Sequence, residues 1–316
     1  MSQGGPAEVQ ARLATVSGFG GLVNAMRGMA AARAQQARTL IAGVNTYADT
    51  VAQAMAQVLS LLPPDQLPDA RVGLPGRAVR RAQGLCLVFG AEQGFNGGFS
   101  EQVLGAIPRP AQGAPGLRCL VLGSQTQRLA ATRGLAVEAS APLVAHAESA
   151  LAAGERIHAL LLEALHRQPG NAVDMVYAEL GAGQHFQVVC RRLLPLDWQT
   201  LPGTARAAPV VHESPERLLQ GLAGEYVAAR LAQAVLHSHA SENLSRLQAM
   251  AAAQDNIGRM KETLQADERR LRQEAITAEV VELAAGLRSL QAQALRPARQ
   301  GAAPRSVWQR SPWLVG

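Results

Sequence analysis

The feature that most constrains the fold of this chain is a long helical seam at each of its two ends. Residues 216–296 contain no proline, and an apolar side chain returns there at every seventh position, with Asn243 as the one exception. Near the N-terminus, apolar side chains alternate at spacings of four and three from Val9 to Leu62, interrupted only by Gly20 and Arg27. Sustained seams of this kind are typical of supercoiled helices. We therefore predict that the two terminal helices pair with each other in antiparallel orientation.

The chain divides into five segments on this basis. We predict an N-terminal coiled-coil helix over 1–62, a linker over 63–82, an α/β domain over 83–213, a C-terminal coiled-coil helix over 214–296 and a basic, disordered tail over 297–316. Pro63-Pro64 would end the first helix, and Ser214-Pro215-Glu216 is a typical helix start. The glycines of Gly18–Gly21 lie inside the first seam and predict a kink or softened turn there.

Between the helices the pattern changes to short apolar runs that alternate with helical stretches. Strands are expected within 85–91, 117–123, 173–180 and 186–194, and helices within 98–107, 124–133 and 144–166. This alternation favours a small Rossmann-like α/β layer domain. The predicted fold class is therefore α/β, with a long antiparallel two-helix coiled coil and a small sheet domain.

Composition narrows the class of protein further. Aromatic residues make up 3% of 316 residues, which suits a helix pair built from Ala, Leu, Val and Met. The formal charge of +6 is carried almost entirely by arginine, since Lys261 is the only lysine, and it favours acidic partners. Cys86, Cys119 and Cys190 stand far apart without CxxC spacing and are expected to be reduced core residues of a cytosolic protein. No run of about 18 apolar residues occurs, so no membrane insertion is expected.

Motifs for catalysis are not found. The stretch Gly90–Gly98 follows a strand and opens a helix, but its glycines do not follow GxGxxG and no lysine is near, which favours a tight turn over a nucleotide site. His237 and His239 would point to opposite sides of a helix, which does not suit a shared metal. Asn243 either fixes the register of the helix pair or marks a place without a partner. We expect no catalytic residue, cofactor or metal.

Five motifs in order resemble the gamma subunit of the rotary F-type ATP synthases, over roughly residues 7–290. They are Asn24–Arg33 (AM-x-MVA-x-K), Glu92–Phe99 (D-x-GLCGG), Val173–Tyr177 with Arg191–Leu196 (VYxxF and LLPL), Ser241-Glu242 with Ala249-Met250 (SE and AM), and Arg272–Glu279 (RQxxITxE). The chain departs from the family at Glu92, Phe95 and Asn96, and it carries arginines where the family's first helix has lysines. It resembles a divergent member, as from a second synthase operon.

The resemblance implies a non-catalytic central shaft that couples ion flow through a membrane rotor ring to ATP synthesis or hydrolysis. Its implied partners are a ring of alpha and beta subunits, the epsilon subunit and a c-type rotor ring. Its implied place is the cytoplasmic side of the bacterial inner membrane, as a peripheral subunit. The contacts to beta subunits carried over from the family, together with two further cations, are Arg272, Gln273, Thr277, Arg27 and Arg33. An apolar bearing is expected at Ala278, Ala285 and Leu290, and the seat for the rotor ring near 205–225.

Two other classes of protein stay open at this point. The first is a coiled-coil nucleic-acid-binding or scaffold protein. Nucleic-acid binding would use arginines and tryptophans on phosphates and bases, but acidic residues interrupt any arginine stripe. An α/β enzyme with a dimerising helical hairpin would bind a nucleotide as the isolated chain. The tail, with Arg296, Arg299, Arg305, Arg310, Trp308 and Trp313, is either disordered or a regulatory contact at the top of the ring.

Overall fold

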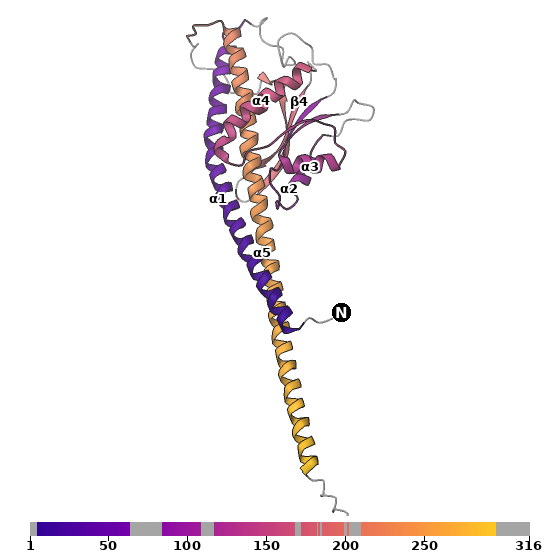
Figure 1. The fold of residues 1–316 in the computed structure, drawn as a ribbon. Coiled ribbons are helices and arrows are strands. Elements are labelled where there is room, and N and C mark those ends of the chain that lie inside the picture. Colours follow the sequence, from indigo (N-terminus) through magenta and orange to yellow (C-terminus); the bar gives the residue numbers. More distant parts are fainter. Residues whose placement is uncertain are drawn as a thin grey trace, which may run out of the picture. The chain divides into compact units, whose positions relative to one another are not determined.

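The computed structural model describes residues 5–63, 84–108, 117–167, 172–181, 183, 185–198, 201 and 210–294 (Figure 1). The chain separates into two compact units, Met1–Ser17 with Arg259–Gly316 and Gly18–Gly258. Helices α1 (Pro6–Leu59) and α5 (Pro215–Ala294) run through both units. The predicted linker beyond residue 63 and the predicted tail lie outside the described residues, so the division into five segments stays a proposal.

In the unit Gly18–Gly258, α1 and α5 pair in antiparallel orientation, as predicted. The hydroxyl of Tyr47 donates to Glu225 at 2.8 Å, and Gln233 donates to Asn45 at 2.9 Å. A Cβ placed on Gly20 would lie 3.3 Å from the Ile257 side chain. The α1 seam is buried or half-buried in this unit at every predicted apolar position, whereas Arg27 is exposed. The alternating spacing therefore identified the paired face of α1.

The unit formed by the two chain ends has its own helix contact. Gln10 donates to Glu268 at 2.9 Å, and Val9 is buried while Leu13 and Val16 are half-buried. Pro6 occupies the first turn of α1 with Glu8 behind it, which suits a helix start. Beyond Leu271, the described side chains of α5 are exposed. None of the described helices has the length and apolar content that a bilayer span requires.

A five-stranded sheet forms the centre of the unit Gly18–Gly258. Its strands are β1 (Leu85–Phe89), β2 (Arg118–Leu122), β3 (Val137–Ala141), β4 (Val173–Leu180) and β5 (Phe186–Leu194), in the spatial order β3-β2-β1-β4-β5. Neighbours are parallel except β4 and β5, which are joined as an antiparallel pair. Four strands match the predicted runs, and the hairpin is confirmed.

Alternating side chains of the strands cover two different layers. Leu87, Phe89 and Met175 face α1, α5 and α4 (Ala150–Arg167), the last preceded by the short helix η1 (Ala147–Ser149). Val88, Val121 and the other strand residues that point to the opposite face pack on α2 (Phe99–Gly105) and α3 (Ser124–Thr132). Burial on both faces explains why β1 and β2 read as continuous apolar runs. In Figure 1 the helix pair lies beside one face of this sheet.

One strand was missed from the sequence, and one expectation is wrong. Strand β3 was missed because Val137-Glu138-Ala139-Ser140-Ala141 has no apolar run; it lies at the sheet edge, where its residues are only partly buried. Cys190 was expected in the core, but it is exposed on β5, the other edge strand, whereas Cys86 and Cys119 are buried. Helix α1 continues unbroken through Gly18–Gly21, and the softened turn there stays a prediction.

Gly154 sets how closely α4 approaches α5. A Cβ at this position would meet the Ala228 carbonyl oxygen at 2.9 Å and the Ala232 Cβ at 3.1 Å. We expect Gly154→Ala to lower the free energy of unfolding by about 1–3 kcal/mol through overpacking, despite alanine's better helix propensity. Gly221→Ala, at an open position of α5, should instead raise it by roughly 1 kcal/mol. Urea unfolding followed by circular dichroism measures both variants. If Gly154→Ala stabilised the protein as much as Gly221→Ala, α4 and α5 would have room for the added methyl group.

Candidate functional site

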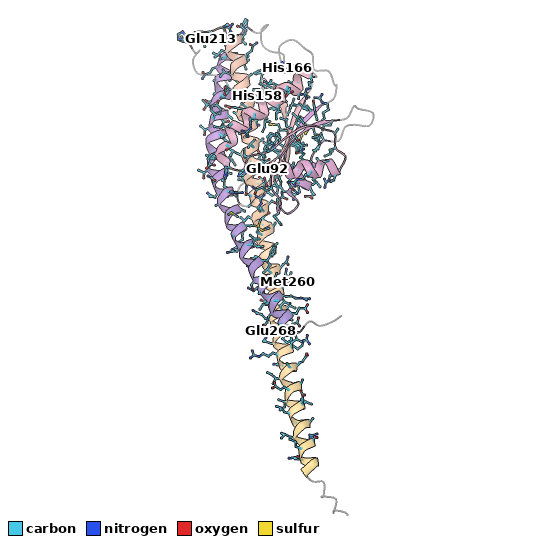
Figure 2. The ribbon with its side chains drawn as sticks, in the orientation of Figure 1. Glu92, His158, His166, Glu213, Met260 and Glu268 are labelled. Carbon is cyan, nitrogen blue, oxygen red and sulfur yellow. The ribbon has the colours of Figure 1, made fainter. Side chains whose placement is uncertain are left out.

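The turn after β1 meets the middle of α5 and forms the first candidate site. Phe95, Gly97 and Gly98 have φ of 60°, 57° and 85°, so the chain reverses within a few residues before α2 begins. A Cβ on Gly97 would lie 3.3 Å from the Ala249 Cβ of α5. The turn therefore lies directly against the helix. Figure 2 labels Glu92, with which the turn begins.

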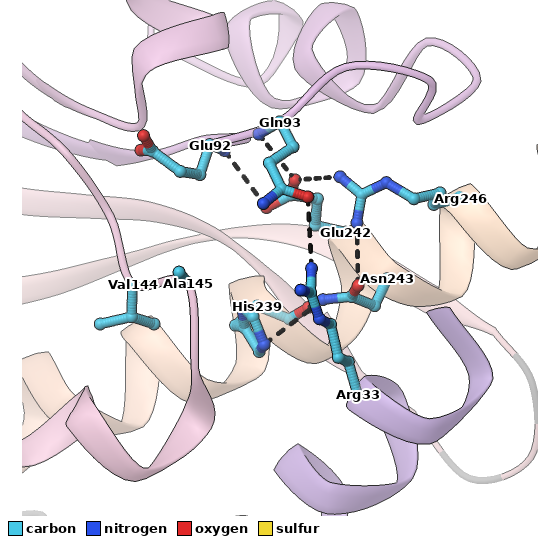
Figure 3. A pocket seen from close by; sticks show the side chains of 9 residues that line it. All are labelled: Arg33, Glu92, Gln93, Val144, Ala145, His239, Glu242, Asn243 and Arg246. Carbon is cyan, nitrogen blue, oxygen red and sulfur yellow. Dashed lines mark hydrogen bonds and ion pairs between the residues drawn. The ribbon is translucent and has the colours of Figure 1, made fainter. Parts of the chain in front are cut away.

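Glu242 of α5 supplies a carboxylate to this turn from within the chain (Figure 3). The backbone N–H groups of Glu92 and Gln93 donate to its two oxygens at 3.2 and 3.0 Å. Arg246, one helical turn further on, donates to Glu242 Oε1 at 2.5 Å, and the side chains of Glu242 and Arg246 are only 2% and 6% exposed, respectively. This is a buried ion pair with a charge-assisted hydrogen bond.

Arg246 and Asn243 extend the same network. Arg246 also donates to the Gly94 carbonyl at 3.2 Å and to Asn243 Oδ1 at 2.8 Å. Asn243 in turn donates to the His239 carbonyl at 2.8 Å and is buried. Of the two interpretations of Asn243, the place without a partner is therefore wrong. From α1, Arg33 donates to Gln93 Oε1 at 3.3 Å and closes the network.

Glu92 makes a second set of bonds that holds the neighbouring loops. Its side chain points away from Glu242 in Figure 3. It accepts the N–H and hydroxyl of Ser124 at 3.1 and 2.6 Å and the N–H of Leu143 at 2.8 Å. A carboxylate is favourable at the first residue of α3, where helix N–H groups are unpaired. Glu92 thus ties β1, α3 and the loop after β3 together.

This geometry supports a structural turn over a nucleotide site. The two amides that could bind a phosphate already bind Glu242. The nine residues of Figure 3 leave essentially no room between them even for a water molecule, whereas ligand pockets begin at roughly 300 Å³. Metal binding is not favoured either: His237 accepts the Leu180 N–H at 3.1 Å, while His239 lies in the network with Asn243. No group of three or more potential metal ligands gathers among the residues that the structure describes.

Serines of α5 attach the helix to strands β1 and β4 and to the turn after β1. Ser238 donates to the Phe89 carbonyl at 3.2 Å and Ser241 to the Ala178 carbonyl at 3.1 Å. Ser245 donates to the Asn96 carbonyl at 2.6 Å. All three are buried, so α5 is surrounded on every side here and its polar groups find partners in the sheet domain.

Burial shifts the pKa values of two groups of the network, Glu242 and His239, and these shifts make the stability of the fold depend on pH. Desolvation raises the pKa of Glu242, and Arg246 with the two amides opposes that rise. Desolvation, together with the positive charges of Arg33 and Arg246, lowers the pKa of His239 to about 4. His239 is therefore neutral in the folded protein at pH 7.

We expect His239→Gln to flatten the pH dependence of stability in mild acid. Between pH 6.5 and about 4 the unfolded chain protonates His239 and the folded chain does not, so stability falls as pH falls, by up to about 3 kcal/mol. The facing charges are Arg33, Arg246, His146 and Glu242, and protonation of Glu242 acts in the opposite direction. Urea midpoints at pH 7 and pH 5 measure the difference. The exposed His166→Gln serves as control, and a slope unchanged by His239→Gln would exclude this origin.

The described end of α5 is the second candidate site. Arg272, Gln273 and Thr277 are exposed there, and the Thr277 hydroxyl donates to the Gln273 carbonyl at 2.8 Å. A shallow depression is lined by Arg270, Gln273, Glu274, Thr277, Ala278 and Val281. Ala278, Ala285 and Leu290 are exposed as well. Of the other predicted contacts, which belong to the unit Gly18–Gly258, Arg27 is exposed on α1 and Arg33 is half-buried at the turn.

An apolar stripe on this part of α5 was not identified from the sequence. Its members recur at spacings of four and three and are 54–65% exposed: Ile276, Val280, Leu283, Leu287 and Leu290. At about 100° per residue, Ala278 and Ala285 lie on the opposite side of the helix from this stripe. The predicted seam followed the small alanines and passed over the larger side chains. Large apolar side chains in a row on an exposed helix indicate a binding surface.

Comparison with known proteins places the chain among synthase subunits. Residues 6–290 match the family model described as ATP synthase. An ATP synthase gamma chain of Heliobacterium modesticaldum is 23% identical over 294 residues, covering 90% of this chain and 99% of the relative. One from Anaeromyxobacter sp. is 26% identical over 288 residues, covering 90% and 98%.

Solved structures agree in fold. A chain in the OSCP/F1/c-ring structure of Euglena gracilis mitochondrial ATP synthase has a TM-score of 0.62 at 14% identity, covering 94% of this chain and 98% of that one. A chain in the central stalk/c-ring structure of the Tetrahymena thermophila enzyme has a TM-score of 0.53 at 17% identity, covering 73% and 99%. The nucleic-acid alternative finds no support in these similarities, and Arg270 of the distal helix pairs with Asp267 and Glu274.

Proposed function

Because this chain belongs to the ATP synthase family, as a gamma chain, we propose that it transmits torque as the central-stalk rotor subunit. It couples ion flow through a membrane rotor ring to ATP synthesis or hydrolysis at catalytic sites on beta subunits. It carries no catalytic site of its own in this proposal. The observation that carries it is the match over 6–290 combined with a distal helix whose apolar stripe needs a surrounding partner.

The proposed partners are an alpha–beta ring around α5, an epsilon subunit and a c-type rotor ring. The similar Euglena and Tetrahymena chains come from structures of F1 with a c-ring and of a central stalk with a c-ring, which supports this set. The α/β domain and the segment near 205–225 are the proposed seat of the ring and epsilon. The similar gamma chains of Heliobacterium and Anaeromyxobacter support a place on the cytoplasmic side of a bacterial inner membrane, where the chain is peripheral.

The physical basis of coupling is that each beta subunit contacts a different side of the shaft. Its nucleotide affinity then depends on the angle of the shaft, since a partner shifts an equilibrium only by its differential contact energy. A change of affinity by about 10⁴ requires roughly 5.5 kcal/mol. A few charge-assisted hydrogen bonds of about 1.5–3 kcal/mol each are sufficient.

Arg272, Gln273 and Thr277 are the proposed donors and acceptors toward a beta-subunit loop. All three are exposed, and no described residue forms an ion pair with Arg272. Arg27 is proposed as a further cation for acidic beta loops because it is exposed on α1. Arg33 uses one of its five donors on Gln93, and the others are proposed to serve the same role.

The proposed bearing has two unlike sides. Leu290 belongs to the apolar stripe, whereas Ala278 and Ala285 present small side chains on the opposite side of α5. Apolar contacts lack the directionality of hydrogen bonds, so a shaft with such a surface turns without being locked at one angle. The unequal sides give the angle-dependent contact that coupling requires.

Assembly is the direct test of this proposal. A tagged chain, expressed with the alpha and beta subunits of its own operon, should copurify with both subunits. The purified complex should hydrolyse ATP. The isolated chain should have no ATPase activity. Recovery of the chain alone, or ATPase activity from the chain alone, would contradict the rotor role.

A further inference from the structure

The buried network at the turn is more polar than packing alone requires. An apolar contact of the same shape would hold α5 against the sheet about as well, because the desolvation cost of a buried ion pair offsets much of its attraction. What the polar network adds is a set of hydrogen bonds with defined directions. Glu242 accepts two amides and one guanidinium N–H at defined positions, and Arg246 holds both the Gly94 carbonyl and Asn243.

These bonds define one angular setting of the turn around α5. Successive residues of a helix differ in direction by about 100°, so no neighbouring residue of α5 can replace Glu242 toward the same amides. Arg33 joins from α1 through Gln93, and Ser245 joins through the Asn96 carbonyl. Three elements of the unit Gly18–Gly258 are thereby held at one point, through hydrogen bonds rather than through sliding apolar surfaces.

Resting on the proposed rotor function, we propose that Glu242, Arg246 and the turn Glu92–Gly97 form a torque joint. The joint fixes the angle of the α/β domain on α5, so that torque applied to that domain turns the helix rather than slipping past it. Glu242 and Arg246 are positioning residues in this role. They touch neither nucleotide nor a beta subunit.

The test compares Glu242→Gln with wild type in the complete synthase reconstituted in vesicles, measuring ATP-driven ion pumping per ATP hydrolysed. Glutamine keeps the shape and removes the charge that holds Arg246. We expect this coupling ratio to fall roughly three- to thirtyfold while ATP hydrolysis continues. The matched control is Glu163→Gln, which breaks an exposed ion pair with Arg167 at the same spacing on α4.

A reversible covalent bond distinguishes a joint from a general packing defect. Gly97→Cys with Ala249→Cys, added to Glu242→Gln, places two thiols across the same contact, where the Cβ separation of 3.3 Å is slightly shorter than the roughly 3.5–4.5 Å of disulfides. Oxidation should restore the coupling ratio, and a reducing agent should abolish it again. Cys190→Ser removes the exposed native thiol.

Each outcome decides the proposal. If Glu242→Gln pumps as well as Glu163→Gln, or if the oxidised disulfide forms and restores nothing, the joint is refuted. Should Glu242→Gln fail to assemble, Arg246→Lys, which keeps the charge but not the three directed bonds, is measured in its place with the same expectation. Failure of the rotor function itself gives a different result, since the wild-type chain would then not support pumping at all.

Discussion

Replacing Glu242 with alanine is expected to lower the free energy of unfolding by about 3–5 kcal/mol, because Arg246 is left charged, buried and without its carboxylate. The two amides of the turn lose their acceptor in the same step. The loss is a large fraction of a typical domain's stability of about 5–15 kcal/mol. Urea unfolding of the full chain, followed by circular dichroism, measures it.

Two further variants separate the missing partner from the missing contact. Glu163→Ala removes the exposed i,i+4 partner on α4 and should cost less than about 1 kcal/mol. Glu242→Met combined with Arg246→Met removes both charges and should recover most of the stability lost in Glu242→Ala. A loss of under 1 kcal/mol in Glu242→Ala would mean that the pair is not buried in solution.

Alanine at both Arg272 and Gln273 is expected to reduce ATPase turnover of the assembled complex about 10- to 100-fold or more, as loss of one or two charge-assisted hydrogen bonds implies. The isolated chain should keep its stability, because both side chains are exposed and no described residue forms an ion pair with Arg272. Steady-state ATP hydrolysis and the unfolding midpoint of the isolated chain measure the two effects.

Gln265→Ala with Arg269→Ala is the matched control for this pair. It removes the same two residue types from exposed positions of the same helix, and turnover should change by less than about twofold, as for surface substitutions of within ±0.5 kcal/mol. Equal loss in both double variants would indicate a general effect of charge on α5. Unchanged turnover in Arg272→Ala/Gln273→Ala would remove those residues from the mechanism.

The spacing of apolar residues and the positions of turn residues were sufficient to predict most of the helices and strands. The four-three spacing identified the paired face of α1 because each seam position needs cover along the whole helix, and the exposure of Arg27 fits its interruption of the series. Strands β4 and β5 coincide with the predicted runs because their ends carry clear turn residues. Strand β3 has no apolar run and lies at a sheet edge, so only its pairing with β2 defines it.

The buried network could not be predicted from the sequence in the same way. Glu242 and the turn at Glu92 are 150 residues apart, and no periodicity reports a contact over that distance. One local signal was present: Glu242 and Arg246 stand four apart and are the only acidic, lysine or arginine residues between Arg230 and Asp255. On the distal helix, the seam drawn through Ala278 and Ala285 obscured the larger stripe through Leu283 and Leu287, because both repeat every seven residues.

Observation of rotation tests the central claim most directly. Cys190 is exposed on β5 whereas Cys86 and Cys119 are buried, so a probe attached through a thiol reports the α/β domain without further substitution. In an immobilised complex of this chain with its alpha and beta subunits, the probe should turn in one direction, in steps, and only while ATP is hydrolysed. A probe that stays at a fixed angle while the ring hydrolyses ATP would contradict the rotor account.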